Sequence, residues 1–258
     1  MHHPFGIDFG GTGIKGAPVD LTVGDFAHDR VRIDTPKPAS PQAVAEVFER
    51  IVGSFEQSTT PVGVTVPGIV RHGVVLSAAN IDKSWLNEDA DAIFTEALGR
   101  EVHVVNDADA AGLAEVEYGA AKGRRGLVMV ITLGTGIGSA MIFDGQLVPN
   151  SEMGHLEIDG AVAESRAATS ARERDGLSWK DWSDRLTTYF RHLERLFTPD
   201  LFVVGGGVSK SWEKFGPLIE VETEIVPATL QNRAGIVGAA LVAQQKGRPD
   251  GLAGRAPG

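Results

Sequence analysis

Apolar residues form two hairpin-like stretches that are far apart in the chain. The first runs from Phe5 to Val19, where a short apolar strand ends in glycines and a second strand returns. The second spans residues 127–143 and has the same form. Each tip carries Gly-Thr-Gly, at Gly11–Gly13 and at Gly134–Gly136. Because a strand–tip–strand unit occurs twice, the sequence predicts two related α/β domains around a cleft.

Hydrophobic periodicity predicts the other elements. The expected strands are residues 30–35, 62–66, 102–105, 201–204 and 222–226, with a hairpin at 70–76. The expected helices are residues 41–55, 89–98, 108–118, 160–171, 178–197 and 234–245, with a short helix after 205–207. Helix 178–197 has the clearest pattern, since Ser178 and Asp181 form a capping pair before an apolar face. That face contains Trp182, Leu186, Tyr189, Leu193 and Leu196.

Composition limits the classes of function. The 258 residues are 42% hydrophobic, which suits one large or two smaller domains with a proper core. The net charge of -10 argues against a general partner for nucleic acid or anionic membrane. No cysteine is present, so disulfides and thiolate metal sites are excluded. We expect a cytoplasmic protein, because no signal peptide precedes Phe5 and no apolar run approaches the ~20 residues of a membrane helix.

The first hairpin tip is a candidate anion site. Its backbone N–H groups can surround an anion, and Asp8 lies where Mg²⁺ or its waters would sit if that anion were a phosphate. Gly11, Gly13 and Gly16 fit the dinucleotide pattern G-x-G-x-x-G, but Gly and Pro in the next six residues oppose the helix that this pattern needs. The Walker pattern is absent. A hairpin whose glycines serve only its turn remains the alternative.

Asn106 and Asp107 lie where a predicted strand ends and a helix begins, which is where open α/β sheets bind ligands. Asp107 either caps the helix or accepts a proton from the hydroxyl of a phosphoryl acceptor. Asn106 could donate to a neighbouring sugar hydroxyl. Position alone does not choose between the cap and the catalyst.

A second polar cluster begins with Glu152 and His155 and continues with Glu157 and Glu164. Carboxylates beside a histidine suit a polyhydroxylated ligand, because each carboxylate accepts two hydroxyl protons. A structural histidine or a His/Glu metal site would use the same residue types. The irregular spacing and the lack of cysteine disfavour structural zinc.

Five motifs together resemble the ROK family of sugar kinases and repressors, within the actin/Hsp70/hexokinase superfamily. They are "DFGGTGIKG", "VVNDADAAGLAE", "TLGTGIGSAMIFDG", "EMGH" and "VVGGGVS". The resemblance implies two ribonuclease-H-like (actin-like ATPase) domains flanking an active-site cleft. The small domain would hold residues 1–106 and helix 234–246, and the larger one residues 107–233. Residues 247–258, rich in Pro and Gly, are expected to form a disordered tail.

The resemblance also assigns roles. Asp107 would be the general base on the sugar 6-hydroxyl. The implied sugar contacts are Gly68, Asn80, Asn106, Asp107, Glu152, His155 and a later Glu. The implied donor-phosphate contacts are Asp8, Gly10, Gly11, Thr12, Gly13, Lys15, Gly134, Thr135 and Gly136, with Asp8 placing Mg²⁺ through water. Gly205, Gly206 and Gly207 resemble the family's adenosine-contacting turn.

One departure points to a branch of the family. The usual cysteine-rich zinc loop is missing, and counting past the deletion matches Glu164 to the later sugar-binding Glu, with Glu157 as the alternative. "GGTGIKGAPVDL", including Lys15, and "LSWKDWSDRL" resemble the zinc-free branch that phosphorylates glucose from inorganic polyphosphate and sometimes from ATP. The basic residues that could guide a polyanion, or simply be solvated, are Lys122, Arg124, Arg125, Arg71 and Lys83.

The sequence therefore predicts an enzyme that makes glucose 6-phosphate with Mg²⁺ and polyphosphate, with a strictly ATP-dependent hexose kinase as the alternative. A sugar-responsive repressor is disfavoured, because only Met1–Pro4 precede the first strand and the net charge is negative. The family would suggest a homodimer.

Overall fold

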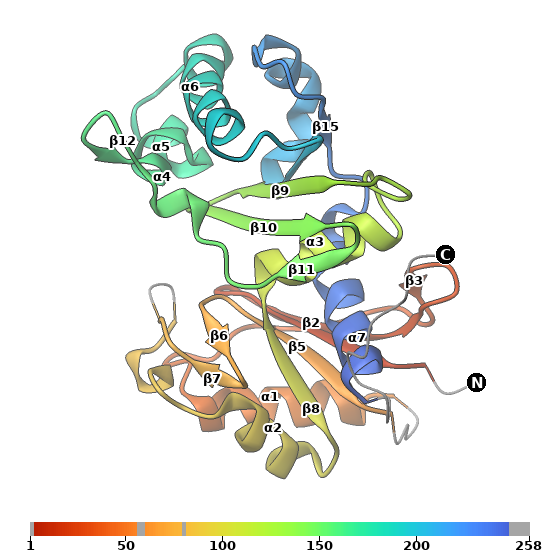
Figure 1. Ribbon diagram of the computed structural model, residues 1–258. Coiled ribbons are helices and arrows are strands. Elements are labelled where there is room, and N and C mark those ends of the chain that lie inside the picture. The colour runs from red at the N-terminus through yellow and green to blue at the C-terminus, as the bar shows by residue number, and fades with distance from the viewer. Residues whose placement is uncertain (1–2, 56–59, 79–80, 248–258) are drawn as a thin grey trace. The chain divides into compact units, whose positions relative to one another are not determined.

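The computed structural model describes residues 3–55, 60–78 and 81–247 and divides the chain into two compact units. One unit contains Met1–Ala110 and Gly235–Gly258, and the other contains Ala111–Ala234 (Figure 1). The predicted sugar contact Asn80 and the tail beyond Gly247 lie outside the described residues.

The first unit is built on a mixed sheet with the order β3-β2-β1-β5-β8, in which β4 also pairs with β2. Strand β1 runs antiparallel to β2 and parallel to β5, and β5 runs parallel to β8. Its strands are β1 (Phe5–Phe9), β2 (Ile14–Asp20), β3 (Asp25–Phe26), β4 (Val31–Ile33), β5 (Val62–Val66) and β8 (Val102–Asn106), and a separate small hairpin holds β6 (Val70–Arg71) and β7 (Val74–Val75).

Helices cover both faces of this sheet because alternate strand residues point to opposite faces. Helices α1 (Pro41–Gly53) and α2 (Ala90–Leu98), with the short 3₁₀ helix η1 (Lys83–Trp85), cover the face formed by Phe5, Ile7 and Phe9. On the other face, α7 (Ala234–Lys246) comes so close that a Cβ atom at Gly6 or Gly63 would meet its backbone. Glycine at these two strand positions therefore permits the close approach of α7.

The second unit repeats the plan of the first (Figure 1). Its sheet has the order β11-β10-β9-β14-β15, with an antiparallel β9–β10 hairpin and parallel pairing of β9 with β14 and of β14 with β15. The strands are β9 (Leu127–Leu133), β10 (Ile137–Phe143), β11 (Gln146–Val148), β14 (Leu201–Gly205) and β15 (Ile225–Pro227). The predicted pair of related α/β domains is confirmed.

Helix α6 (Trp179–Phe197) covers one face of the second sheet. It starts as predicted, with the Ser178 hydroxyl accepting from the backbone N–H of Asp181 at 3.1 Å. Of the five residues expected on its buried face, only Leu196 is misplaced: it lies in the last turn and is 53% exposed. Phe190 is fully buried instead.

Helix α3 (Asp107–Glu117) supplies a buried carboxylate to the second unit. Glu115 is 1% exposed, and it accepts hydrogen bonds from the backbone of Ala120 at 2.8 Å and of Leu230 at 2.7 Å. It also accepts from the backbone N–H and the hydroxyl of Thr229. These contacts satisfy the carboxylate and fix the segment that leads towards α7.

The predicted helix at 160–171 is wrong in part. The structure has the small hairpin β12 (Glu157–Ile158) and β13 (Ala161–Val162), followed by α4 (Ala163–Ala167) and α5 (Thr169–Arg174). Ala168 is extended (φ -62°, ψ 158°) and separates the two helices. This break lets Ser170 bond to carbonyls of the second hairpin tip, at Gly134 and Thr135.

Strand β15 begins at Ile225 and not at Glu222 as predicted, because the backbone and hydroxyl of Thr223 are bonded to the Glu194 carboxylate. The remaining short 3₁₀ helices are η2 (Met153–His155), η3 (Gly207–Lys214), η4 (Gly216–Leu218) and η5 (Gln231–Arg233).

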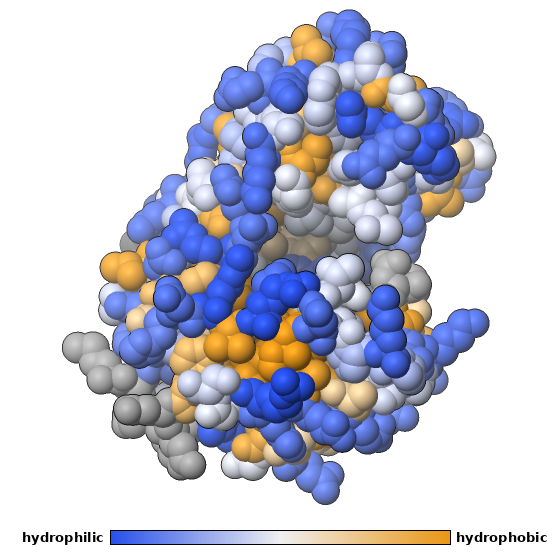
Figure 2. All heavy atoms as spheres, turned by 180° about the vertical axis from the view of Figure 1, so that it is seen from behind, coloured by the Kyte–Doolittle hydropathy of each residue, from blue (hydrophilic) through white to orange (hydrophobic). Residues whose placement is uncertain are grey.

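Hydrophilic residues cover most of the face drawn in Figure 2. Among the described residues, the large apolar side chains that are exposed lie on several different elements; they are Val23, Leu86, Phe143, Val148, Val162, Leu196 and Leu218. Within the described ranges, no helix is both long and apolar enough to cross a lipid bilayer.

Candidate active site

The first hairpin tip is held closed by its own backbone and by side chains from β4 and the segment after it. Gly10 N donates to Gly13 O at 3.2 Å, and the Thr35 hydroxyl donates to Gly10 O at 2.5 Å. Arg32 donates to Thr12 O at 3.2 Å and lies so close to Gly13 that a Cβ there would touch its guanidinium. The tip is thus fixed in shape, and Gly13 leaves room for the arginine beside it.

Asp8 is oriented from two sides. Lys15, its partner across the hairpin, donates to Oδ2 at 3.2 Å, and the hydroxyl of the fully buried Thr65 donates to Oδ1 at 3.1 Å. The same Thr65 oxygen accepts from Phe9 N at 3.2 Å. A Cβ at Gly235, at the start of α7, would lie 3.1 Å from Oδ1. The predicted phosphate-loop residues Asp8 and Lys15 therefore form one fixed pair.

A single carboxylate fits a magnesium ion held largely by water and substrate phosphates, which is the usual mode for Mg²⁺. Asp8 has a side chain that is 24% exposed and lies beside the loop, so it fits such a role. Across residues 3–55, 60–78 and 81–247, no three His, Cys, Asp or Glu side chains are arranged to hold a metal ion directly.

The hydrogen bonds at the end of β8 show which residue caps α3. The Asn106 side chain accepts from Ala108 N at 2.9 Å and from Asp109 N at 3.1 Å, while its amide donates to Gly68 O at 3.0 Å. Asn106 is buried, whereas Asp107 is exposed. Asn106 thus fills the N-cap position, and Asp107, the next residue, is not required for it. The structure also brings the predicted sugar contact Gly68 to Asn106.

The second hairpin tip is connected to the acidic cluster. Gly134 N donates to Gly136 O at 3.0 Å, and Ile137 N donates to Glu164 Oε2 at 3.1 Å. A Cβ at Gly136 would collide with the same carboxylate oxygen. Glycine at this position therefore allows the Glu164 carboxylate to reach the tip.

Glu152, His155 and Glu164 come together in the second unit. His155 Nδ1 lies 3.6 Å from Glu152 Oε2, and its Nε2 lies 3.6 Å from Glu164 Oε1. Burial raises the pKa of the Glu152 carboxyl, and Glu164 adds to this while His155 opposes it. Glu157 is exposed on β12, whereas Glu164 lies 3.6 Å from the His155 imidazole, so of the two candidates the structure places Glu164 in the cluster. Such a set of carboxylates and imidazole can accept several hydroxyl protons.

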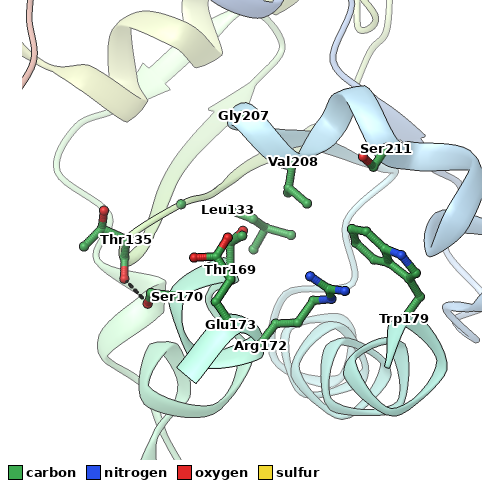
Figure 3. Close-up of a pocket in the computed structure, with 11 residues that line it drawn as sticks. Leu133, Thr135, Thr169, Ser170, Arg172, Glu173, Trp179, Gly207, Val208 and Ser211 are labelled. Atoms are coloured by element: carbon green, nitrogen blue, oxygen red, sulfur yellow. Dashed lines mark hydrogen bonds between the residues drawn. The ribbon is translucent and has the colours of Figure 1, made fainter. Parts of the chain in front are cut away.

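Next to the second tip, a pocket of about 440 Å³ opens between β9, α5, the start of α6 and η3 (Figure 3). Its lining residues are Leu133, Gly134, Thr135, Thr169, Ser170, Arg172, Glu173, Trp179, Gly207, Val208 and Ser211. The predicted nucleotide turn thus contributes Gly207 to the same pocket as Gly134 and Thr135, two predicted phosphate contacts. Gly206 has φ 88°, and a Cβ there would clash with the Leu133 backbone, so this turn requires glycine.

Thr65 and Arg172 are among the contributors to these sites that were not predicted from sequence. Thr65 is the one polar residue in the apolar strand "VGVTV", which is the signal that could have identified it. Arg172, in contrast, lies one residue beyond the helix predicted to end at Ala171, and no local pattern places it beside Trp179. The basic candidates Arg71, Lys83 and Arg125 are exposed, and Arg124 forms an ion pair with Glu224.

Comparison with known proteins agrees with these motifs. Residues 4–168 match the ROK family. The chain is 51% identical over 242 residues to a polyphosphate glucokinase of Mycobacterium tuberculosis (strain CDC 1551 / Oshkosh), covering 93% of this chain and 91% of that protein.

Two solved structures share the fold. The inorganic polyphosphate/ATP-glucomannokinase of Arthrobacter sp. strain KM is 58% identical with a TM-score of 0.89, covering 94% of this chain and 98% of that one. A ROK family glucokinase of Streptomyces griseus, in complex with glucose and AMPPNP, is 24% identical with a TM-score of 0.79, covering 94% and 99%. The described units therefore have the fold of the ROK sugar kinases, which is the actin-like ATPase fold. The chain belongs to the ROK family.

Proposed function

We propose that this chain transfers the terminal phosphoryl group of inorganic polyphosphate to the 6-hydroxyl of glucose and so forms glucose 6-phosphate. The observation that carries this proposal is the 51% identity, over 93% of the chain, to a polyphosphate glucokinase. The phosphate loops and the Glu152–His155–Glu164 cluster are consistent with a donor of this charge and an acceptor with many hydroxyls.

In this proposal Asp107 is the general base. As the glucose oxygen O6 bonds to the terminal phosphorus, the bridging P–O bond breaks, the shortened chain leaves, and the O6 proton passes to the Asp107 carboxylate. Asp107 is suited to this role because it is exposed and because Asn106 caps the helix. Asn106, Gly68, Glu152, His155 and Glu164 would bind the sugar.

The two tips would bind the donor phosphates through backbone N–H groups and the hydroxyls of Thr12 and Thr135. Asp8 would hold Mg²⁺ through water, and when bound this ion would supply positive charge to the phosphate oxygens. Lys15 holds Asp8 and adds a positive charge beside the loop. We also propose that the protein is a cytoplasmic homodimer with no nucleic-acid or membrane partner, as the family resemblance and the charge of -10 suggest.

ATP is a second candidate donor. The Arthrobacter protein, 58% identical to this chain, is described as acting with polyphosphate and ATP. The pocket beside Gly134 and Gly207 has a volume within the range of small-molecule sites, so it supports this second candidate as well.

The test is a donor comparison with the purified protein, glucose and Mg²⁺, in which glucose 6-phosphate is measured with nucleotide-free polyphosphate or with ATP. The Asp107→Asn variant, prepared identically, reports any contaminating kinase. We expect faster turnover with polyphosphate. Turnover with ATP alone would overturn the polyphosphate proposal and leave a strictly ATP-dependent hexose kinase.

A further inference from the structure

The pocket beside the second hairpin tip contains two buried polar atoms without a partner. Among the described residues, Arg172 Nε and Thr169 Oγ1 are both buried and form no hydrogen bond. Both residues line this one pocket, together with Thr135 and Ser170. A buried donor or hydroxyl left without a partner costs about 1–3 kcal/mol, so two of them on residues that line one cavity point to a ligand that would bind them once the side chains adjust to it.

Arg172 has an unusual position in that pocket. Its guanidinium carbon lies 3.7 Å from the centre of the Trp179 ring, and Figure 3 shows the side chain extending towards the indole. No carboxylate in the described ranges forms an ion pair with it. Phe215 lies nearly parallel to the same indole, at 16° with ring centres 5.9 Å apart. The arginine is therefore held by stacking, and its N–H groups are not used by an acidic partner.

This arrangement discriminates between a nucleotide and a phosphate chain. A purine is bound best by stacking on an aromatic face, but the guanidinium already occupies a face of Trp179. Phosphate oxygens, in contrast, match the donor geometry of a guanidinium, and every phosphate of a polyphosphate chain carries negative charge. The volume of about 440 Å³ would admit either ligand, so the chemistry of the lining decides.

We propose that this pocket binds phosphate groups of the polyphosphate chain, and that Arg172, held over Trp179, is the residue that favours a phosphate chain over a nucleoside there. Thr169 contributes its hydroxyl to the same phosphate oxygens. Glu173 lines the pocket too, and its exposed carboxylate opposes anion binding. This inference rests on the proposed function, since it concerns the donor of that reaction.

The test compares donors in the Arg172→Met variant, which keeps an unbranched apolar side chain over the indole. We expect kcat/KM for polyphosphate to fall roughly 10- to 100-fold, which is about 1.4–2.8 kcal/mol, because one charge-assisted contact is lost. The KM for glucose should change less than about threefold. The kcat/KM for ATP should change less than about threefold, since methionine still covers the same face of the indole.

Two controls separate a pocket effect from a general one. Arg195→Met makes the same change of charge at an exposed position of α6 outside the pocket, and it should leave both donors unaffected. Thr169→Val is close in shape to the native residue and removes only the hydroxyl. It should lower kcat/KM for polyphosphate by roughly three- to tenfold, and it decides the matter if Arg172→Met fails to fold.

The outcomes distinguish this inference from the proposed function. If the unmodified protein uses only ATP, the proposed function fails and this inference fails with it. If the unmodified protein uses polyphosphate but Arg172→Met and Thr169→Val keep its full kcat/KM, the inference alone is overturned. Equal losses with polyphosphate and ATP would also overturn it, because the residue would then act on both donors alike.

Discussion

Replacing Asp107 by asparagine should separate catalysis from folding at the start of α3. The neighbouring Asn106 carries the structural role, since it caps the helix and donates to Gly68 O at 3.0 Å. Asp107 is exposed, and its Oδ1 accepts from Ala108 N at 2.9 Å, a bond that an asparagine oxygen also accepts. The two variants Asp107→Asn and Asn106→Ala should therefore have opposite signatures.

The magnitudes follow from these contacts. Asn106→Ala loses a helix cap, worth about 0.5–2 kcal/mol, and a buried hydrogen bond of about 1 kcal/mol, so the free energy of unfolding should fall by about 1.5–3 kcal/mol. Asp107→Asn loses only a favourable charge in the first helical turn, about 0.3–1 kcal/mol. Its kcat should fall by roughly 10²–10⁴, because the general base is removed.

The assay measures three quantities for each variant: kcat for glucose 6-phosphate formation, the Kd for glucose by calorimetry, and the free energy of unfolding in urea. For Asp107→Asn we expect a loss of kcat, with glucose Kd and stability close to those of the unmodified protein. Glu117→Gln, an exposed charge change on the same helix, is the control. Near-normal kcat in Asp107→Asn would remove Asp107 from the mechanism, and a large loss of stability there would refute the assignment of the cap to Asn106.

Three further predictions concern the second unit. Burial raises the pKa of Glu152 above its ordinary 4.5, so the stability that this group contributes is present at low pH and is lost as pH rises through its pKa in the folded protein. In the proposed function the ionised Glu152 accepts protons from sugar hydroxyls, so calorimetry across the acid range should show glucose affinity falling on acidification, with a midpoint above 4.5. Gly136→Ala should raise the KM for glucose by roughly tenfold or more, because its methyl group displaces the Glu164 carboxylate. Glu115→Ala should lower the free energy of unfolding by about 3–5 kcal/mol in urea titrations, since its hydrogen-bond donors lose a buried charged partner, while Glu117→Ala should cost less than about 0.5 kcal/mol.

Each of these has a clear contrary result. A midpoint at or below 4.5 would show that ionisation of Glu152 does not control glucose binding. An unchanged KM for glucose in Gly136→Ala would mean that the position of Glu164 does not matter to the sugar. A loss at Glu115 no larger than at Glu117 would mean that the buried network contributes little to stability.

Local signals explain why much of the fold could be predicted. A strand that ends in Gly-Thr-Gly and returns is a continuous pattern, so the sequence predicts both hairpins. The position of Asp8 beside the first tip follows from the first of them. Capping is equally local, and Ser178 begins α6 as expected. The division of the chain into domains at the boundaries inferred from the family, like the sugar and phosphate roles, stays a prediction.

Contacts between residues distant in sequence explain the failures. Ala168 ends α4 because Ser170 bonds to the second tip, more than thirty positions earlier, and a run of small residues gives no sign of this. The Glu194 carboxylate accepts a hydrogen bond from Thr223 N, and β15 therefore begins only at Ile225. The stacking of Arg172 on Trp179 joins α5 to the start of α6 across a turn, and no local pattern in the sequence predicts it.

The central claim is that polyphosphate, and not ATP, is the preferred phosphoryl donor. The most direct measurement supplies both donors together, at equal concentrations of transferable phosphoryl groups, and counts ADP formed per glucose 6-phosphate. The account predicts a ratio far below one, because most phosphoryl groups come from polyphosphate. A ratio of one would contradict it, since every phosphoryl group would then come from ATP.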